Sequence, residues 1–216
     1  MGQYYFGVIL SDNDYENIKE NKKMTCTAAY YTHDTGNGLK LMEHSYVGND
    51  YVAIYEHLLS NEHKGKRLIW CGDYADDIRT LIARKEGTRT TRKKNEEKIT
   101  AYEIGSKFND EHQSEQKEFI DKMKAPTMLC RYLINYDKKE YVDLFKAVKN
   151  MDKWGCVIHP LPLLTCSGNG RGGGDYRGRN KRLVGSWALD HIGLARWDDR
   201  IDEEFKEITP NFQEKR

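Results

Sequence analysis

The stretch from residue 168 to residue 178 holds six glycines in eleven positions and follows the apolar run Trp154 to Thr165 closely. Glycine loses more conformational freedom on folding than any other residue and weakens both helices and strands. So dense a group predicts an irregular loop that uses left-handed turns, bare amide groups or a close approach to a partner. We take this glycine-rich loop, residues 167–182, as the predicted functional site.

Basic side chains accompany the glycines, with five positive charges in the twelve residues 171–182. Consecutive loop amides can form a nest that binds anions, and guanidinium groups pair well with phosphate. The loop therefore predicts binding of a phosphorylated small molecule or nucleotide, with Tyr176 or Trp187 stacked on a base. The alternative is a glycine-rich hairpin with a solvated basic edge. The predicted ligand-binding residues are Asn169, Gly170, Arg171, Gly172, Gly173, Asp175, Tyr176, Arg177, His159 and Trp187.

Two nucleotide-binding motifs and one catalytic motif are not supported. Gly168-x-Gly170-x-x-Gly173 has the letters of a dinucleotide fingerprint, but residues 175–182 offer no apolar face for the helix that must follow. No Gly-Lys-Ser/Thr is present, which excludes a P-loop. The run 184–191 holds a serine, an aspartate and a histidine, but it lacks the nucleophile elbow of a hydrolase.

A second candidate site follows the short apolar strand that ends near residue 71. Asp73 and Asp76 carry carboxylates of the kind that bind a hard metal ion, and they are the predicted metal ligands. A metal-dependent phosphoesterase that uses Asp73, His159 and Asp190 around a metal ion is one hypothesis for function. Helix capping by Asp73 and Asp76 and a hydrogen-bonded core histidine are the structural alternatives. The sequence names no cofactor and favours a binding protein over an enzyme.

Composition restricts the partners. Lys and Arg total 35 against 34 Asp and Glu, so net charge gives no support for nucleic-acid binding. Residues 84–98 alone carry seven positive charges against three negative ones, which predicts an exposed basic loop. No apolar run is long enough to cross a membrane, and no secretory leader is apparent. The five cysteines include no Cys-x-x-Cys pair, so we expect a cytoplasmic protein.

The pattern of apolar residues predicts a single α+β domain, residues 1–216, with a mainly antiparallel sheet and a few flanking helices. Residues 138–150 fit either a helix or a strand. The predicted helices cover residues 50–59, 77–84, 111–124 and 198–208. The predicted strands cover residues 4–10, 24–32, 39–47, 67–71, 99–104, 128–136, 154–159 and 184–194, with 24–32 and 39–47 forming a hairpin.

Three segments, His159–Thr165, Gly168–Tyr176 and Val184–Ala188, resemble segments of uncharacterised proteins from bacteriophages and prophage-like regions. Trp70–Asp76 and Lys139–Asp143 are similar to stretches of the same proteins. The resemblance implies a phage-like origin and a host-cytoplasmic setting, but it supplies no activity and no catalytic residue. In that setting the protein would sequester a signalling nucleotide and counteract host defence. The alternative is a protein-interaction module that docks on a host macromolecule through its loops and its acidic C-terminal segment.

Overall fold

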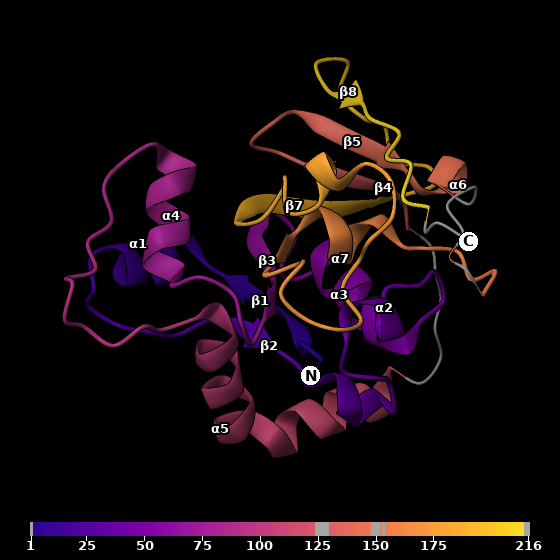
Figure 1. The fold of residues 1–216 in the computed structure, drawn as a ribbon. Coiled ribbons are helices and arrows are strands. Elements are labelled where there is room, and N and C mark those ends of the chain that lie inside the picture. The colour runs from indigo at the N-terminus through magenta and orange to yellow at the C-terminus, as the bar shows by residue number, and fades with distance from the viewer. Residues whose placement is uncertain (1, 124–129, 148–151, 153, 214–216) are drawn as a thin grey trace.

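An eight-stranded sheet organises the chain, with strand order β2-β1-β3-β7-β4-β5-β8 and with β6 paired to β3. The computed structural model describes residues 2–123, 130–147, 152 and 154–213. The β3–β6 and β5–β8 pairs are parallel, and the other pairs are antiparallel. The predicted α+β class is confirmed (Figure 1). The strands are β1 (Tyr5–Leu10), β2 (Ala28–Ala29), β3 (Lys66–Gly72), β4 (Cys130–Asn135), β5 (Glu140–Asp143), β6 (Cys166–Ser167), β7 (Asp190–Arg196) and β8 (Lys206–Glu207).

Helices begin where short polar side chains cap their first turns. Ser11 and Thr100 each form a capping box, and the side chains of Asn49 and Asp77 accept amide hydrogen bonds from the helices that follow them. Asp77 therefore caps the helix for which Asp73 and Asp76 were the predicted caps. The helices are α1 (Asp12–Lys19), α2 (Leu41–His44), α3 (Asp50–Ser60), α4 (Ile78–Glu86), α5 (Ala101–Lys122), α6 (Leu144–Ala147) and α7 (Pro160–Leu164), with 3₁₀ turns η1 (Thr32–Thr35) and η2 (Lys181–Leu183).

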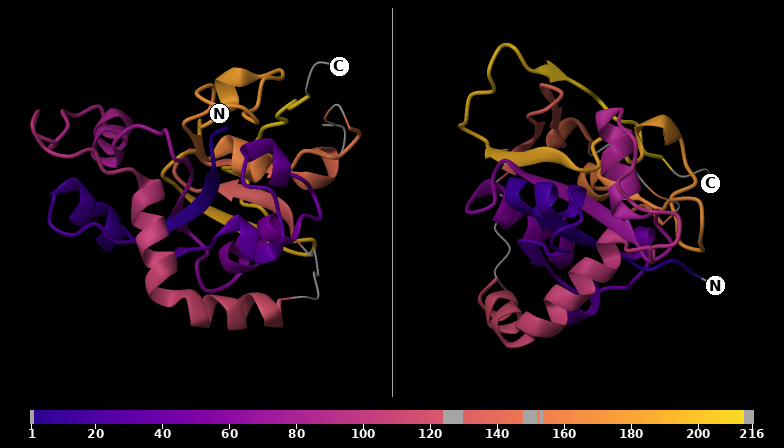
Figure 2. Two further views of the ribbon diagram at one scale, coloured as in Figure 1. Left: turned by 60° about the horizontal axis from the view of Figure 1, so that its bottom comes forward. Right: turned by 90° about the vertical axis from the view of Figure 1, so that its left-hand side faces the viewer.

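Aromatic side chains pack against helices on both faces of the sheet. Phe6 of β1 packs on Tyr102 of α5 with ring centres 4.3 Å apart, whereas Trp70 of β3 packs on Tyr55 of α3 at 4.8 Å. Phe6 and Trp70 lie on opposite faces because Trp70 is paired with Gly7, the neighbour of Phe6. The helix α5 bends at His112 and turns around the side of the sheet (Figure 2).

The basic loop after α4 is mostly exposed, but buried contacts anchor it. Arg79 is 3% exposed and donates to the Asp77 carboxylate at 2.8 Å and to the Glu97 carbonyl at 2.9 Å. It also pairs with Glu96 at 3.2 Å. The loop therefore folds back on α1 and α4, and the three segments form a projection beside the sheet (Figure 1).

The predicted hairpin and two other predicted elements are wrong. Residues 24–32 and 39–47 do not form a hairpin, because β2 is only two residues long and 39–47 holds the short helix α2 instead of a strand. Residues 99–104 hold the first turn of α5, because Thr100 caps a helix there. The acidic segment 198–208 is a run of turns that ends in β8.

Two predicted strands are shorter than expected. In segment 154–159, the pairing is an isolated bridge between Ile158 and Tyr46. Residues 184–189 form turns, and β7 begins only at Asp190. Residues 124, 128–129 and 148–150, which belong to other predicted segments, lie outside the described residues. None of the helices formed by the described residues has the length and apolar character needed to cross a bilayer.

Candidate functional site

The amide nest predicted in the glycine-rich loop exists, but a carboxylate of the chain itself fills it. Oδ2 of Asp175 accepts hydrogen bonds from the amides of Gly170, Arg171 and Gly172 at 2.6, 2.9 and 3.0 Å. Oδ1 accepts a hydrogen bond from the Tyr5 hydroxyl at 2.9 Å, and Asp175 is 3% exposed. These amides were predicted to face a phosphate, and instead they hold an internal anion.

The two aromatic residues predicted to stack on a base are core residues. Tyr176 is 1% exposed, packs edge-on against Phe212 and donates its hydroxyl to the Arg179 carbonyl at 2.6 Å. Trp187 is also 1% exposed, and its indole donates to Glu140 at 2.9 Å. Neither ring has a free face, so the stacking interpretation of both residues is corrected.

Other predicted ligand residues also have structural partners. Asn169 closes the loop, because its side chain exchanges hydrogen bonds with the backbone of Tyr176 at 2.8 and 3.1 Å. His159 is buried and caps α7, with Nδ1 accepting from the Leu161 amide at 3.1 Å and Nε2 lying 3.1 Å from Glu56. The structure therefore fits the core alternative for His159.

The glycine-rich loop separates its two candidate arginines. Arg171 reaches a cavity of about 610 Å³, whereas Arg177 and Gly173 line a different cavity of about 410 Å³ that Lys40 and Trp154 share. Neither cavity is lined by both arginines.

The predicted metal pair has other contacts. The Asp73 carboxylate accepts the Tyr4 amide at 3.2 Å, and burial raises the pKa of Asp73. Asp76 pairs with Arg171 at 2.7 Å and with Arg84 at 3.3 Å. The hydrogen bond from Arg171 holds the pKa of Asp76 below its ordinary value. Within the described part of the chain, no three His, Cys, Asp or Glu residues are grouped to hold a metal ion.

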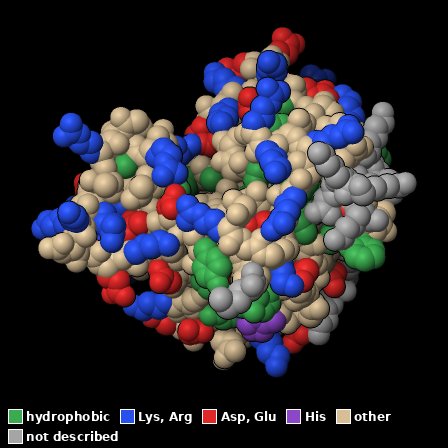
Figure 3. Space-filling view, in the orientation of Figure 1, with side chains coloured by type: hydrophobic (Ala, Val, Ile, Leu, Met, Phe, Trp, Pro, Cys, Tyr) green, Lys and Arg blue, Asp and Glu red, His purple; other side chains and the backbone are tan. Residues whose placement is uncertain are grey.

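The larger cavity lies between α4, the end of the sheet and the glycine-rich loop. Lys and Arg side chains gather around a hollow on this face, beside the projection that carries α4 (Figure 3). Its apolar wall comes from Ile69 of β3, Leu81 of α4 and the turns at 184–189. The basic residues that line it are Arg84, Lys85, Lys138, Arg171 and Lys181. We call this the cationic cavity.

Hydrogen-bond acceptors of the chain orient two of the lysines. Lys85 of α4 pairs with Asp190, which is fully buried and also accepts from the Asn135 side chain at 2.7 Å. Lys138, in the turn between β4 and β5, donates to the Ser186 carbonyl at 2.6 Å. If Asp190 faced Arg171 or Arg177 it would be a salt-bridge partner rather than a catalyst, and in the structure its ion-pair partner is Lys85.

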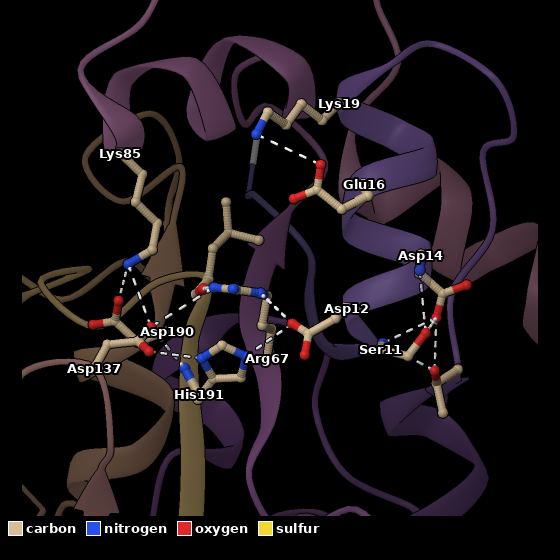
Figure 4. Close-up of polar contacts among 12 residues, drawn as sticks. Ser11, Asp12, Asp14, Glu16, Lys19, Arg67, Lys85, Asp137, Asp190 and His191 are labelled. Carbon is tan, nitrogen blue, oxygen red and sulfur yellow. Dashed lines mark hydrogen bonds and ion pairs between the residues drawn. The ribbon is translucent and has the colours of Figure 1, made fainter.

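A polar network supports the lysine side of the cavity (Figure 4). His191 lies between two carboxylates, with Nδ1 2.6 Å from Asp137 and Nε2 2.9 Å from Asp12. Arg67 joins the same carboxylates, at 3.1 Å from Asp12 and 3.7 Å from Asp137. Lys85 lies 4.0 Å from Asp137 and so connects this network to the cavity.

Sequence reasoning identified Arg171 and missed most of its neighbours in the cavity. Arg84 and Lys85 were assigned to the exposed basic loop rather than to a site, and Lys138 was given no functional role. The one available signal was the excess of positive charge in 84–98, which does not say which of those side chains turn inward.

Comparisons with known proteins supply no relative for this chain. No protein-family model matches the chain, and neither the curated proteins nor the solved structures include a match. The function proposed below therefore depends on the cationic cavity itself.

Proposed function

We propose that the chain binds a phosphorylated small molecule or nucleotide in the cationic cavity. The observation that carries this proposal is the convergence of five Lys and Arg side chains, from three separate segments, on one cavity of about 610 Å³. Like charges gathered around a hollow repel one another and attract anions. Phosphate suits such a site, because guanidinium and ammonium groups bind it through charge-assisted hydrogen bonds.

The size and the backbone of the cavity support the same proposal. Small-molecule sites commonly enclose roughly 300–1,000 Å³, and the cationic cavity falls in that range. Leu189 in its wall has a left-handed backbone, with φ at 64°. Such a conformation is unfavourable for a bulky side chain, and strained backbone is concentrated at ligand sites.

The proposed ligand site differs from the one that the sequence predicts. Side chains, rather than loop amides, would hold the phosphate, with Arg171 as the residue common to both. A protein that sequesters a phosphorylated signalling molecule would serve a bacteriophage in the host cytoplasm, the setting that the sequence resemblance implies.

Two arginines of the same loop provide a matched test. Calorimetric titration with inorganic phosphate and a nucleotide panel at low salt should show binding to the native chain. Arg171→Ala should weaken it by about tenfold or more, equivalent to about 1.4 kcal/mol. Arg177→Ala removes the same charge from the other side of the loop, and it should leave the affinity for phosphate and nucleotides within about twofold of the native value. Equal effects of the two substitutions would refute the assignment to this cavity.

An exposed aromatic cluster favours protein docking as a second candidate function. Phe145 and Trp197 are 59% and 63% exposed, with ring centres 5.7 Å apart. The Arg131 guanidinium lies 4.6 Å from the centre of the Trp197 ring. Trp and Arg dominate the energetics of many protein interfaces. Trp197→Ser should leave phosphate binding unchanged, and a loss of phosphate binding in that variant would show that this cluster is not a separate surface.

A further inference from the structure

We infer that the ligand of the cationic cavity carries two phosphate groups on a compact aliphatic or sugar body. The inference rests on the proposed function and deepens it, because it names the class of phosphorylated molecule. Three observations lead to it: the grouping of the basic side chains, their net charge, and the chemistry of the wall.

Four of the five basic side chains form two groups, which have different partners. Arg84 and Arg171 meet at Asp76, at 3.3 and 2.7 Å. The second group contains Lys85, which pairs with Asp190, and Lys138, which donates to the Ser186 carbonyl in the turn just before Asp190.

Helix geometry and the different partners of the two groups separate them in the cavity. Arg84 and Lys85 are consecutive residues of α4, so their side chains leave the helix about 100° apart. Both nevertheless line the same cavity. One phosphate at the arginine group and another at the lysine group would therefore be held at separate positions.

The charges call for more than one phosphate. Five basic side chains line the cavity, and the carboxylates of Asp76 and Asp190 neutralise two of them, which leaves three positive charges. A phosphate monoester carries about −1.5 to −2 at neutral pH. One phosphate would leave about one of the three positive charges without a counter-charge, whereas two phosphates would neutralise all three.

The wall is suited to an aliphatic or sugar body. Ile69, Leu81, Val184, Ala188 and Leu189 form it, and no described lining residue is aromatic. The two rings that the sequence predicts to stack on a base, Tyr176 and Trp187, are each 1% exposed. A nucleobase would find aliphatic contacts but no stacking partner, and stacking is the usual source of base affinity.

Paired probes that differ by one phosphate test the inference. We would titrate the native chain with fructose 6-phosphate, fructose 1,6-bisphosphate and AMP at low salt. The bisphosphate should bind about tenfold or more tightly than the monophosphate. Lys138→Met and Arg171→Ala should each remove most of that difference. Lys139→Met, the adjacent residue, which pairs with Glu204 and does not line the cavity, should retain it.

The outcomes separate this inference from the proposed function. Equal affinity for the monophosphate and the bisphosphate, with both lost in Arg171→Ala, would overturn the inference and leave the proposed function standing. AMP binding more tightly than the bisphosphate would also overturn it, because the body would then be a nucleoside. If none of the probes or inorganic phosphate bound, the proposed function itself would fail. Melting temperatures equal to that of the native chain would show that each variant is folded.

Discussion

Replacing Asp175 with alanine should destabilise the glycine-rich loop and the fold around it. The Asp175 carboxylate accepts hydrogen bonds from the amides of Gly170, Arg171 and Gly172 and from the hydroxyl of Tyr5. Because Asp175 is only 3% exposed, little water is present to replace them. A hydrogen bond to a charged group contributes roughly 1.5–3 kcal/mol, and a buried donor left unpaired costs about 1–3 kcal/mol.

The four contacts share one carboxylate, so their contributions do not add in full. We expect Asp175→Ala to lower the free energy of unfolding by roughly 3–5 kcal/mol, similar to the loss of one partner from a buried charged pair. For a chain of 216 residues, each kcal/mol shifts the melting temperature by roughly 2–4 °C. The melting temperature should therefore fall by roughly 6–20 °C.

Urea and thermal unfolding, followed by circular dichroism, would measure the loss. Asp175→Asn keeps one oxygen to accept the loop amides, so it should lose only about 1–2 kcal/mol. Formate, which has the shape of the missing carboxylate, should restore part of the stability of Asp175→Ala and none of that of the native chain. If Asp175→Ala were within about 1 kcal/mol of the native chain, the loop amides would not depend on this carboxylate and the reasoning would be refuted.

Three further predictions concern the loop, the polar network and a helix start. Gly172→Ala should destabilise the fold by about 1–3 kcal/mol in urea, because its Cβ would lie 2.4 Å from Cβ and 2.6 Å from the amide nitrogen of Gln3. Burial raises the pKa of Asp137, but hydrogen bonds from His191 outweigh it and hold that pKa below its ordinary value. The ionised Asp137 therefore stabilises the fold above its unfolded pKa of about 3.9, and this stability is lost as pH falls through the lower folded pKa. His191→Gln should make the free energy of unfolding fall less steeply as pH is lowered. An unchanged dependence on pH would show that His191 does not lower the pKa of Asp137. Thr100→Ala should cost about 1 kcal/mol and expose the start of α5 to faster hydrogen exchange, and protection equal to that of the native chain would count against the capping box.

Elements with strong local patterns could be predicted from the sequence. The strands at 4–10 and 67–71 are dense in apolar residues, and β1 and β3 occupy these positions. The helix at 50–59 shows apolar residues on one face, and α3 begins and ends within one residue of that prediction. In each case burial of a continuous apolar face decides the structure, and the sequence displays that face directly.

The false hairpin shows where local patterns mislead. Gly36-Asn37-Gly38 fits a hairpin turn, but Gly36 ends the 3₁₀ turn η1 with φ at 74°. Leu41 and His44 are both buried and lie three residues apart, which is helical spacing. The turn residues were recognised correctly, and the elements on either side were not, because the same glycine geometry serves a helix end and a hairpin.

The cationic cavity could not be predicted, because its basic residues converge only in the folded chain. Arg84, Lys138 and Arg171 are far apart in sequence and arrive from α4, from the turn between β4 and β5 and from the glycine-rich loop. Each is an ordinary exposed basic residue in its own segment. They differ from other exposed basic residues only in lining the same cavity. Their proximity depends on β7 lying between β3 and β4 in the sheet.

The amide pattern of the glycine-rich loop fits two kinds of anion, an external phosphate or a carboxylate of the chain itself. Three consecutive amides in a nest attract an anion, and the sequence already contains one three residues beyond Gly172, at Asp175. Once that carboxylate fills the nest, the loop becomes a rigid support. The Arg171 amide is fixed inside it, while the Arg171 side chain donates to the Tyr74 carbonyl at 2.6 Å and pairs with Asp76. Phosphate binding should therefore weaken in Asp175→Ala even though Asp175 does not line the cationic cavity, because the residue that holds Arg171 in place is lost.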